Sequence, residues 1–260
     1  MGTRNPPRRA RASHQALRES VKKLHLRFIR QINDVHIFAQ QAVALLSDAK
    51  AECDGATEQR RKYYIPSFSA GQKAAKRSDE EMRELYDRFV SRDLYENLIV
   101  AGVSRCESYL FDVAREVFRA YPEKMNVSIK GMDPERTVPL KLVLEAGSID
   151  ELIEQVVAAR LGAVSYASPK SYLEFLKALI SIDTEDKAFV SFVEIKATRD
   201  LLVHGSGLIN DIYLIKCQTS ARGARGEQIK VDRPYFDHCV AIFRRVSYLS
   251  NKSVSTTFRG

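Results

Sequence analysis

One short segment combines side chains that suit phosphate chemistry with a signal for a helix end. Residues 194–207 have the sequence Glu-Ile-Lys-Ala-Thr-Arg-Asp-Leu-Leu-Val-His-Gly-Ser-Gly, in which Arg199 and Asp200 precede His204. The glycine after His204 predicts the end of an apolar-faced helix. Five helical residues advance about 500°, so Arg199 and His204 diverge by about 140° and still reach one cleft beside the helix end. A guanidinium offers a planar fork to a phosphoryl group, and an imidazole moves protons near neutral pH.

The spacing of arginine and histidine does not identify a site by itself. The same spacing occurs at Arg9/His14 and at Arg233/His238. The first copy lies in a tail rich in proline and arginine, and the second has a proline directly after the arginine. The copy that ends on His204 combines a polar second position, an apolar triplet and a following Gly-x-Gly loop. We therefore take this copy as the candidate catalytic pair.

The segment Arg-Asp-Leu-Leu-Val-His at 199–204, followed by Gly-Ser-Gly-Leu-Ile-Asn, resembles the signature of the HEPN superfamily. That signature is an arginine, then a polar residue such as Asn, Asp or His, then a histidine after four to six intervening residues. Residues 104–115, Ser-Arg-Cys-Glu-Ser-Tyr-Leu-Phe-Asp-Val-Ala-Arg, are similar to an inner helix of these proteins, close to the RiboL-PSP branch. The resemblance spans residues 79–250.

The resemblance implies a metal-independent endoribonuclease without a cofactor. In such an enzyme the 2′-hydroxyl of single-stranded RNA attacks the adjacent phosphate and leaves a 2′,3′-cyclic phosphate. His204 would act as general base or acid, Arg199 would neutralise the phosphorane, and Asp200 would orient one of them. Glu107, which lies among apolar residues, is a second supporting candidate as a buried acid near the cleft. An exposed carboxylate, or one paired with an arginine, is the alternative for Glu107.

The resemblance also implies how the protein is assembled and used. Two chains would pair so that the two motifs face one cleft, which makes a homodimer the expected state. The implied setting is that of a toxin or an anti-phage defence effector, with RNA as substrate and an antitoxin or regulatory protein as partner.

Three other interpretations of the same residues stay open. A non-catalytic HEPN module would use the cleft to bind a nucleotide or RNA, or as a dimer scaffold. Alternatively, Arg199 and Asp200 form a surface ion pair, and His204 caps the helix end, where the dipole favours a cation. A DNA-binding regulator would instead use the basic N-terminal segment.

The net charge of the chain is concentrated at its N-terminus. The 260 residues carry a formal charge of +8, and residues 1–30 hold nine Lys or Arg against the single acid Glu19. A basic arm on a neutral body favours contact with a polyanion, and a solubilising tail is the alternative. We take Arg8, Arg9 and Arg11 as candidate RNA-binding residues in this arm.

The cysteines and the lengths of the apolar runs indicate in which cellular compartment the protein is expected. The four cysteines are scattered without a Cys-x-x-Cys pair, which is typical of reduced thiols in a cytosolic protein. No apolar run approaches the roughly 20 residues that span a bilayer, and no apolar stretch follows the basic N-terminus as in a signal peptide. We expect a cytoplasmic protein with no membrane segment and no metal site.

The chain divides into five predicted parts. A disordered basic arm covers 1–13, and a long helix with a nearly heptad apolar stripe covers 14–53. A basic loop covers 54–77, where basic residues alternate with aromatic ones around Tyr63 and Tyr64; such a stretch binds single-stranded nucleic acid or pins a surface loop. The HEPN-like helical domain covers 78–250, and a fraying tail covers 251–260.

The helical domain begins at the capping box of Ser78 and Glu81, and we expect a kink near Ser91. Residues 212–217 and 228–231 predict a small hairpin. The flexible loop between its strands would present Arg222 and Arg225, as a phosphate-gripping tip or a solvated turn. The predicted fold is therefore an all-α, HEPN-like bundle of about six helices with a long N-terminal helix and at most one short β-hairpin.

Overall fold

The structure is a computed structural model that describes residues 8–53, 61–69, 71–129, 137–165 and 169–258. The predicted all-α class with one small hairpin is confirmed. In chain order the elements are α1 (Arg8–Glu52), β1 (Arg61–Ser67), β2 (Gly71–Arg77), α2 (Asp79–Arg88), the π-helical turn η1 (Phe89–Asp93), α3 (Leu94–Ala120), η2 (Pro122–Asn126), α4 (Leu140–Glu145), α5 (Ile149–Ser165), α6 (Pro169–Ile180), α7 (Lys187–His204), α8 (Asp211–Cys217), η3 (Gln218–Ser220) and α9 (Arg233–Thr257).

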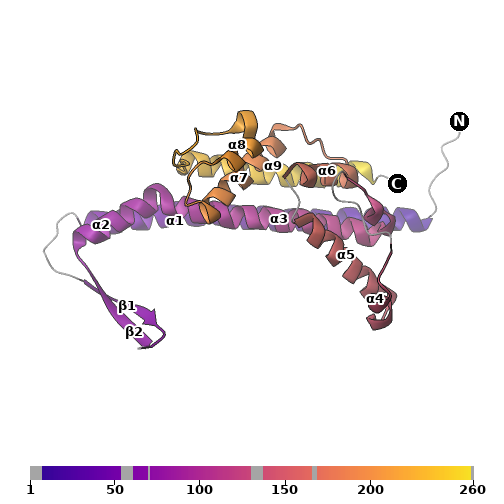
Figure 1. Ribbon diagram of the computed structural model, residues 1–260, viewed down its shortest axis with the longest axis horizontal. Helices are drawn as coiled ribbons and strands as arrows, with labels where there is room; N and C mark the ends of the chain where they lie inside the picture. Colours follow the sequence, from indigo (N-terminus) through magenta and orange to yellow (C-terminus); the bar gives the residue numbers. More distant parts are fainter. Residues whose placement is uncertain (1–7, 54–60, 70, 130–136, 166–168, 259–260) are drawn as a thin grey trace.

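Two long helices form the axis of the molecule. Helices α1 and α3 run antiparallel beside each other, and α7 and α9 pack against them (Figure 1). The β1–β2 hairpin projects from the end where α1 leads to α2, and α4 and α5 project from the opposite end. Helix α8 lies outside α7, away from the axis.

The apolar stripe of α1 is confirmed over the first part of the helix. Leu17, Val21, Phe28 and Ile32 are buried, and the buried stripe ends at Ala39. The continuation of the stripe was predicted wrongly, because Phe38 and Leu45 are exposed. The first turns of α9 lie beside α1 from His36, whose Nε2 is 3.0 Å from Oδ1 of Asp237, to Val43. Beyond that point α1 packs mainly on α2 and η1, so a full stripe is not covered.

The expected kink near Ser91 is a π-helical turn between α2 and α3. A π turn holds one extra residue per turn and shifts the faces of the two flanking helices. The capping box that begins α2 is also confirmed, since the Glu81 amide donates to Ser78 and the Ser78 amide donates to Glu81. Further along, α3 crosses α9 closely at Gly102, where a Cβ would lie 2.7 Å from the ring of Phe243.

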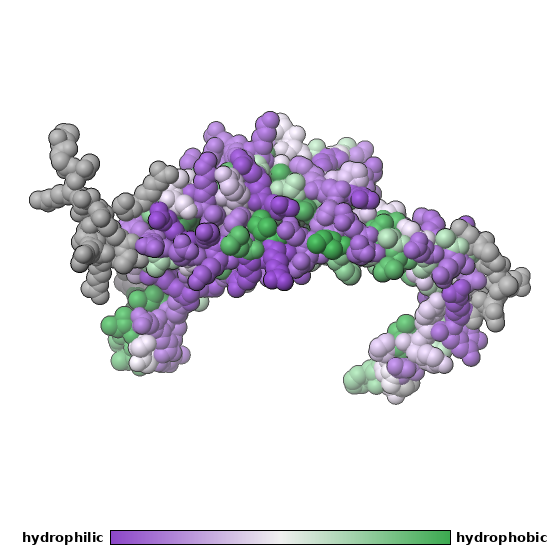
Figure 2. Space-filling view, turned by 180° about the vertical axis from the view of Figure 1, so that it is seen from behind, coloured by the Kyte–Doolittle hydropathy of each residue, from purple (hydrophilic) through white to green (hydrophobic). Residues whose placement is uncertain are grey.

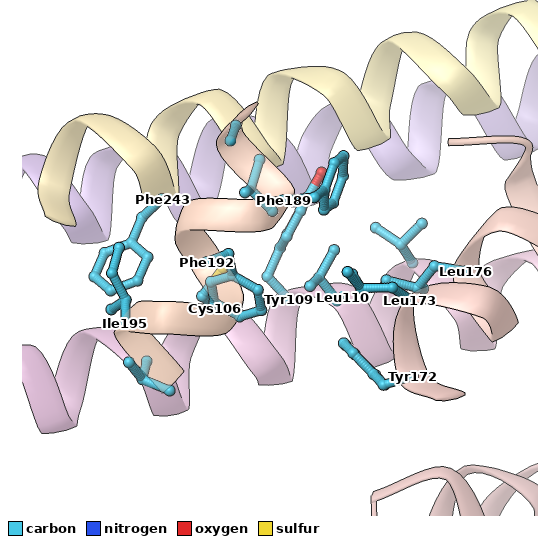
Figure 3. Packing of buried hydrophobic residues seen from close by; sticks show 14 of the residues in the cluster. Cys106, Tyr109, Leu110, Tyr172, Leu173, Leu176, Phe189, Phe192, Ile195 and Phe243 are labelled. Atoms are coloured by element: carbon cyan, nitrogen blue, oxygen red, sulfur yellow. The ribbon is translucent and has the colours of Figure 1, made fainter. Parts of the chain in front are cut away.

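Helix α7 is held by apolar contacts on several sides. Phe189, Phe192 and Ile195 extend from α7 toward α3 and α9, and Phe243 of α9 meets them (Figure 3). Leu173 and Leu176 of α6 belong to the same core. This packing fixes the α7 backbone just before the segment that carries the candidate site.

Two segments differ from the prediction. The part of the predicted basic loop that the structure describes is an antiparallel hairpin from Arg61 to Arg77, while 54–60 lie outside the described residues. Over 251–257 the predicted fraying tail is instead the last turns of α9, because Val254 and Phe258 are buried and the Phe258 ring stacks on Tyr121 at 4.7 Å between centroids. Residues 259–260 lie outside the described residues. Tertiary contacts, which local sequence does not reveal, hold the end of α9.

The N-terminal arm also differs where it is described. Residues 8–13 continue α1 toward the N-terminus, so Arg8, Arg9 and Arg11 lie on helical backbone, while 1–7 fall outside the described residues. The four cysteines, Cys53, Cys106, Cys217 and Cys239, are buried free thiols. Within the described residues, every helix is too short or too polar to cross a lipid bilayer.

Candidate functional site

The helix that carries the motif ends where the sequence predicts. Its N-terminus is capped by Asp186, whose side chain accepts a hydrogen bond from the amide of Ala188. At the other end, the amides of Gly205 and Gly207 both donate to the carbonyl of Leu201, at 2.8 and 3.0 Å. A Cβ on Gly207 would lie 2.2 Å from Nε2 of Gln228, and its φ is +76°, so this position requires glycine.

A cleft of about 400 Å³ lies between this helix end and α8. The α7 wall carries Asp200 and the exposed His204, which are four residues apart and therefore share a face. The α8 wall carries Lys216 and Tyr213. The cleft thus brings an imidazole, a carboxylate and an ammonium group to one solvent-accessible surface.

Asp200 links two cations beside this cleft. Its Oδ1 accepts a hydrogen bond from Nη1 of Arg199 at 3.1 Å, and its Oδ2 accepts one from Nζ of Lys216 at 3.0 Å. All three side chains are 27 to 28 % exposed. One carboxylate between two cations leaves a net charge of +1, so a phosphate that enters the cleft can compete with Asp200 for the Lys216 ammonium group.

Arg199 itself is not among the residues that line the cleft. It lies behind Asp200, and its Nε is buried with no hydrogen-bond partner in the described part of the chain. The helical geometry explains this position, because consecutive residues are separated by about 100° around the axis. The structure therefore brings His204 and Asp200 into the cleft and connects Arg199 to it through Asp200.

The α8 wall corrects the predicted hairpin. Residues 212–217 are helical, because the side chain of Asn210 accepts a hydrogen bond from the amide of Tyr213 and starts a helix there. An isolated antiparallel bridge joins Leu208 to Gln228 instead. The apolar run Ile-Tyr-Leu-Ile suits a strand and a short buried helix alike, and the Asn cap decided between them.

Glu107 does not line the cleft. Its Oε1 pairs with Nζ of Lys196, which also lies 5.5 Å from the ring centroid of Tyr172. Lys196 is one turn before Asp200 on α7, so the Glu107 pair borders the Asp200 cluster along the helix. The pairing matches the alternative of an ion-paired carboxylate, with a lysine in place of the expected arginine.

A second charged cluster lies inside the protein on the same helix. Glu194 is buried, and its Oε1 accepts hydrogen bonds from Thr198, Tyr213 and the Nε of Arg222, each at 2.7 or 2.8 Å. Its Oε2 accepts one from the Tyr235 hydroxyl at 2.9 Å. These partners come from α7, α8, the 218–232 segment and α9, so Glu194 ties the α8 wall of the cleft to the body.

Arg222 is therefore not the solvent-directed tip of a flexible loop. Its Nη1 donates to the carbonyl of Lys230 at 2.7 Å, and its guanidinium lies 3.4 Å from the ring centroid of Tyr235. The amide of Arg222 also donates to the hydroxyl of Tyr213. The loop prediction was wrong because a buried carboxylate, which local sequence does not reveal, draws this arginine inward.

The other predicted RNA-binding residues remain at the surface or outside the described side chains. Arg225 is 73 % exposed and pairs with Asp211 at 3.2 Å. The side chains of Arg8, Arg9 and Arg11 are not described.

The described residues at the two other copies of the spacing, His14, Arg233 and His238, are not part of this cleft. His14 packs edge-on against the ring of Tyr121, and Arg233 lies 3.8 Å from Asp237 one turn further along α9.

Sequence reasoning missed Lys216. It is 16 residues beyond Asp200 in a segment that was predicted to be a strand, and no motif marks it. Assigning that segment to a helix would have placed Lys216 on the face that meets α7.

Comparison of the chain with protein-family models, with curated proteins and with solved structures found no match. The function therefore has to be argued from the geometry of the site.

Proposed function

We propose that the protein is a metal-independent endoribonuclease of the HEPN type that cuts single-stranded RNA. The observation that carries the proposal is the exposed imidazole of His204 on a cleft that also holds the Asp200–Lys216 pair, with Arg199 bonded to the same carboxylate. A role as a toxin or an anti-phage effector, controlled by an antitoxin or regulatory protein, belongs to the same proposal.

The cleft offers the groups that phosphoryl transfer within RNA needs. The 2′-hydroxyl loses its proton and forms a bond to the adjacent phosphorus, while the 5′-oxygen leaves with a proton. His204 moves one of these protons, and the cations of Arg199 and Lys216 neutralise the charge on the phosphorane oxygens. The products are a 2′,3′-cyclic phosphate and a 5′-hydroxyl, and the nucleophile comes from the substrate.

A second copy of the chain completes this site. The reaction needs both a base and an acid, and each chain offers one imidazole at its cleft. Apolar side chains flank the cleft and are exposed, with Ile212 and Ile215 at 63 and 73 %. Val203 and Leu208, which neighbour His204 and Gly207 in the chain, are also exposed. Exposed apolar side chains gathered at a site mark an interaction surface, which supports a homodimer that faces the two His204 side chains toward each other.

The dimer is tested by light scattering at tens of micromolar. We expect a mass of two chains for the wild type and one chain for the double variant Ile212→Lys/Ile215→Lys. Ile37→Lys/Leu45→Lys, an equally exposed apolar pair on α1, is the matched control and should leave the mass unchanged. A monomeric wild type, with and without RNA, contradicts the paired site.

The reaction is tested with purified protein in excess chelator. It should cut single-stranded RNA to cyclic-phosphate ends and leave the same sequence intact as DNA, because DNA lacks the 2′-hydroxyl. His204→Ala should lower the rate at least about 100-fold, the usual scale for a general acid or base. His14→Ala and His238→Ala, the histidines at the other copies of the spacing, should cut like the wild type. Cleavage that requires a divalent metal or survives His204→Ala overturns the mechanism.

One observation favours a second function. Arg199 is held by Asp200 and is not part of the cleft lining, as a binding or scaffold module without catalysis would allow. If the wild type binds RNA without cutting it, and Lys216→Gln weakens that binding, the protein is a non-catalytic binding module.

A further inference from the structure

The β1–β2 hairpin stands away from the helical body with its side chains in solvent. Phe68, in the turn, is fully exposed, and Tyr64 is 65 % exposed. The hairpin is anchored near its base, where Nε of Arg61 lies 3.1 Å from Oδ1 of the buried Asp79. Figure 2 shows it as a protrusion that is mostly hydrophilic, with hydrophobic residues toward its end. An isolated two-stranded hairpin is only marginally stable in water. Because Tyr64 and Phe68 are exposed, they do not stabilise the hairpin by packing in a hydrophobic core.

The charge of the hairpin has a single sign. Residues 61–77 contain five Lys or Arg and no acidic residue. Apart from Arg61, these cations have no acidic partner in the described structure; they are Lys62, Lys73, Lys76 and Arg77.

The strand register brings like charges together. Lys62 is paired with Lys76, and directly opposite residues of an antiparallel pair point to the same face. Tyr64, two residues along β1, lies on this face as well. Two ammonium groups side by side disfavour the hairpin unless an anion lies between them. An exposed aromatic ring next to that pair adds a stacking surface.

We propose that this hairpin is a binding surface for single-stranded RNA, separate from the His204 cleft. Phosphates bind along Lys62 and Lys76, and bases stack on Tyr64 and Phe68. This combination of an unpaired basic track with exposed aromatic rings is how proteins hold single strands without sequence preference. The choice of RNA rests on the proposed function, whereas the binding surface rests on the hairpin alone.

The position of the cations favours a polynucleotide over an anionic membrane. Seven residues per strand span about 23 Å, so the cations near the base lie roughly 20 Å from the tip. If the tip entered a bilayer, those charges would be beyond the Debye length of about 8 to 10 Å. A strand of RNA that runs along the face of Tyr64 contacts Lys62 and Lys76 near the base without having to reach them from the tip.

The test is a binding titration with the full-length His204→Ala protein in chelator, so that the RNA stays intact. A fluorescently labelled oligouridylate is titrated between about 50 and 200 mM salt. Lys62→Gln/Lys76→Gln should reduce the slope of log K against log salt by about 1.4, since each phosphate contact to a single strand contributes about 0.7. Tyr64→Ala and Phe68→Ala should each weaken binding by at least about fivefold.

The matched control is Lys141→Gln/Lys177→Gln, which removes the same charge from exposed positions on α4 and α6. It should leave the slope unchanged. An unchanged slope in the Lys62/Lys76 variant, or an equal change in the control, overturns the proposal. Binding to phosphatidylserine vesicles that requires Phe68, with RNA binding unaffected by all hairpin variants, assigns the hairpin to membranes and also overturns it. If the wild type never cuts RNA but the hairpin variants bind it more weakly, the nuclease proposal fails and this one stands.

Discussion

Two charged clusters lie on α7 only six residues apart, and they use the same side-chain types in opposite ways. Glu194 is buried, and both of its oxygens accept hydrogen bonds from partners on other elements. Asp200 is partly exposed and lines an open cleft together with Lys216, while its second cation, Arg199, is bonded to it from outside the cleft lining. The first cluster holds the fold around the cleft, and the second presents charge to a ligand.

The difference shows how to separate structural arginines from functional ones. A buried ion pair has paid its desolvation cost through several fixed hydrogen bonds, so its members are not available to a ligand. A cation that shares a partly exposed carboxylate with a second cation can exchange that carboxylate for a phosphate at little cost. By this criterion Arg222 is structural and Arg199 is the better candidate for function, although the sequence made both candidates.

The largest expected effect is the loss of stability when the buried Glu194 cluster is broken. Glu194→Gln removes the buried carboxylate that Arg222, Tyr213 and Tyr235 bond, which should lower the free energy of unfolding by about 3 to 5 kcal/mol. Asp200→Asn, the same change at the exposed cluster, should cost less than about 1 kcal/mol. Urea denaturation followed by circular dichroism measures both. Equal losses would mean that the two clusters do not differ as described.

An exchange of arginine for lysine sharpens the comparison. Arg222→Lys loses the fork that bonds Glu194 and the Lys230 carbonyl, so we expect a loss of about 2 kcal/mol in unfolding free energy. Arg199→Lys should cost less than about 1 kcal/mol in stability and still lower RNA cleavage almost as much as His204→Ala does. An Arg199→Lys protein that is unstable but cuts normally would assign Arg199 to the fold.

The smallest expected effect concerns pH. Burial, followed by the charge of Glu194, raises the pKa of the Cys217 thiol to about 12, and burial likewise raises the pKa of Cys239 to about 12. Because the folded pKa lies above the unfolded value of 9.0, stability is fully present below pH 9 and is lost as the pH rises toward 12.

Urea denaturation at pH 8 and pH 10 checks this pH dependence. We expect a loss of about 1 kcal/mol from each of Cys217 and Cys239 at pH 10, and a smaller total loss for Cys217→Ala. A Cys217→Ala protein with the full pH dependence of the wild type would contradict this role of the buried cluster.

Local signals in the sequence account for much of the fold. The Ser78 capping box and the helix end at Gly205 are both confirmed, because each depends on a few neighbouring residues. The hairpin was missed because Pro66 in β1, and the lysines and alanines of β2, are poor signals for a strand. The end of α9 was missed because its helix is stabilised by contacts with distant residues.

The sequence by itself determined the helical class, the helix that carries Arg199 and His204, and the position where that helix ends. These follow from periodicity and capping, which act over a turn or two of chain. The tertiary structure alone decided that Lys216 joins Asp200, that Arg222 turns inward to Glu194, and that Glu107 pairs with Lys196. Each of these contacts links residues 16 to 89 positions apart, and the direction of a charged side chain depends on which partner the packed helices bring within reach.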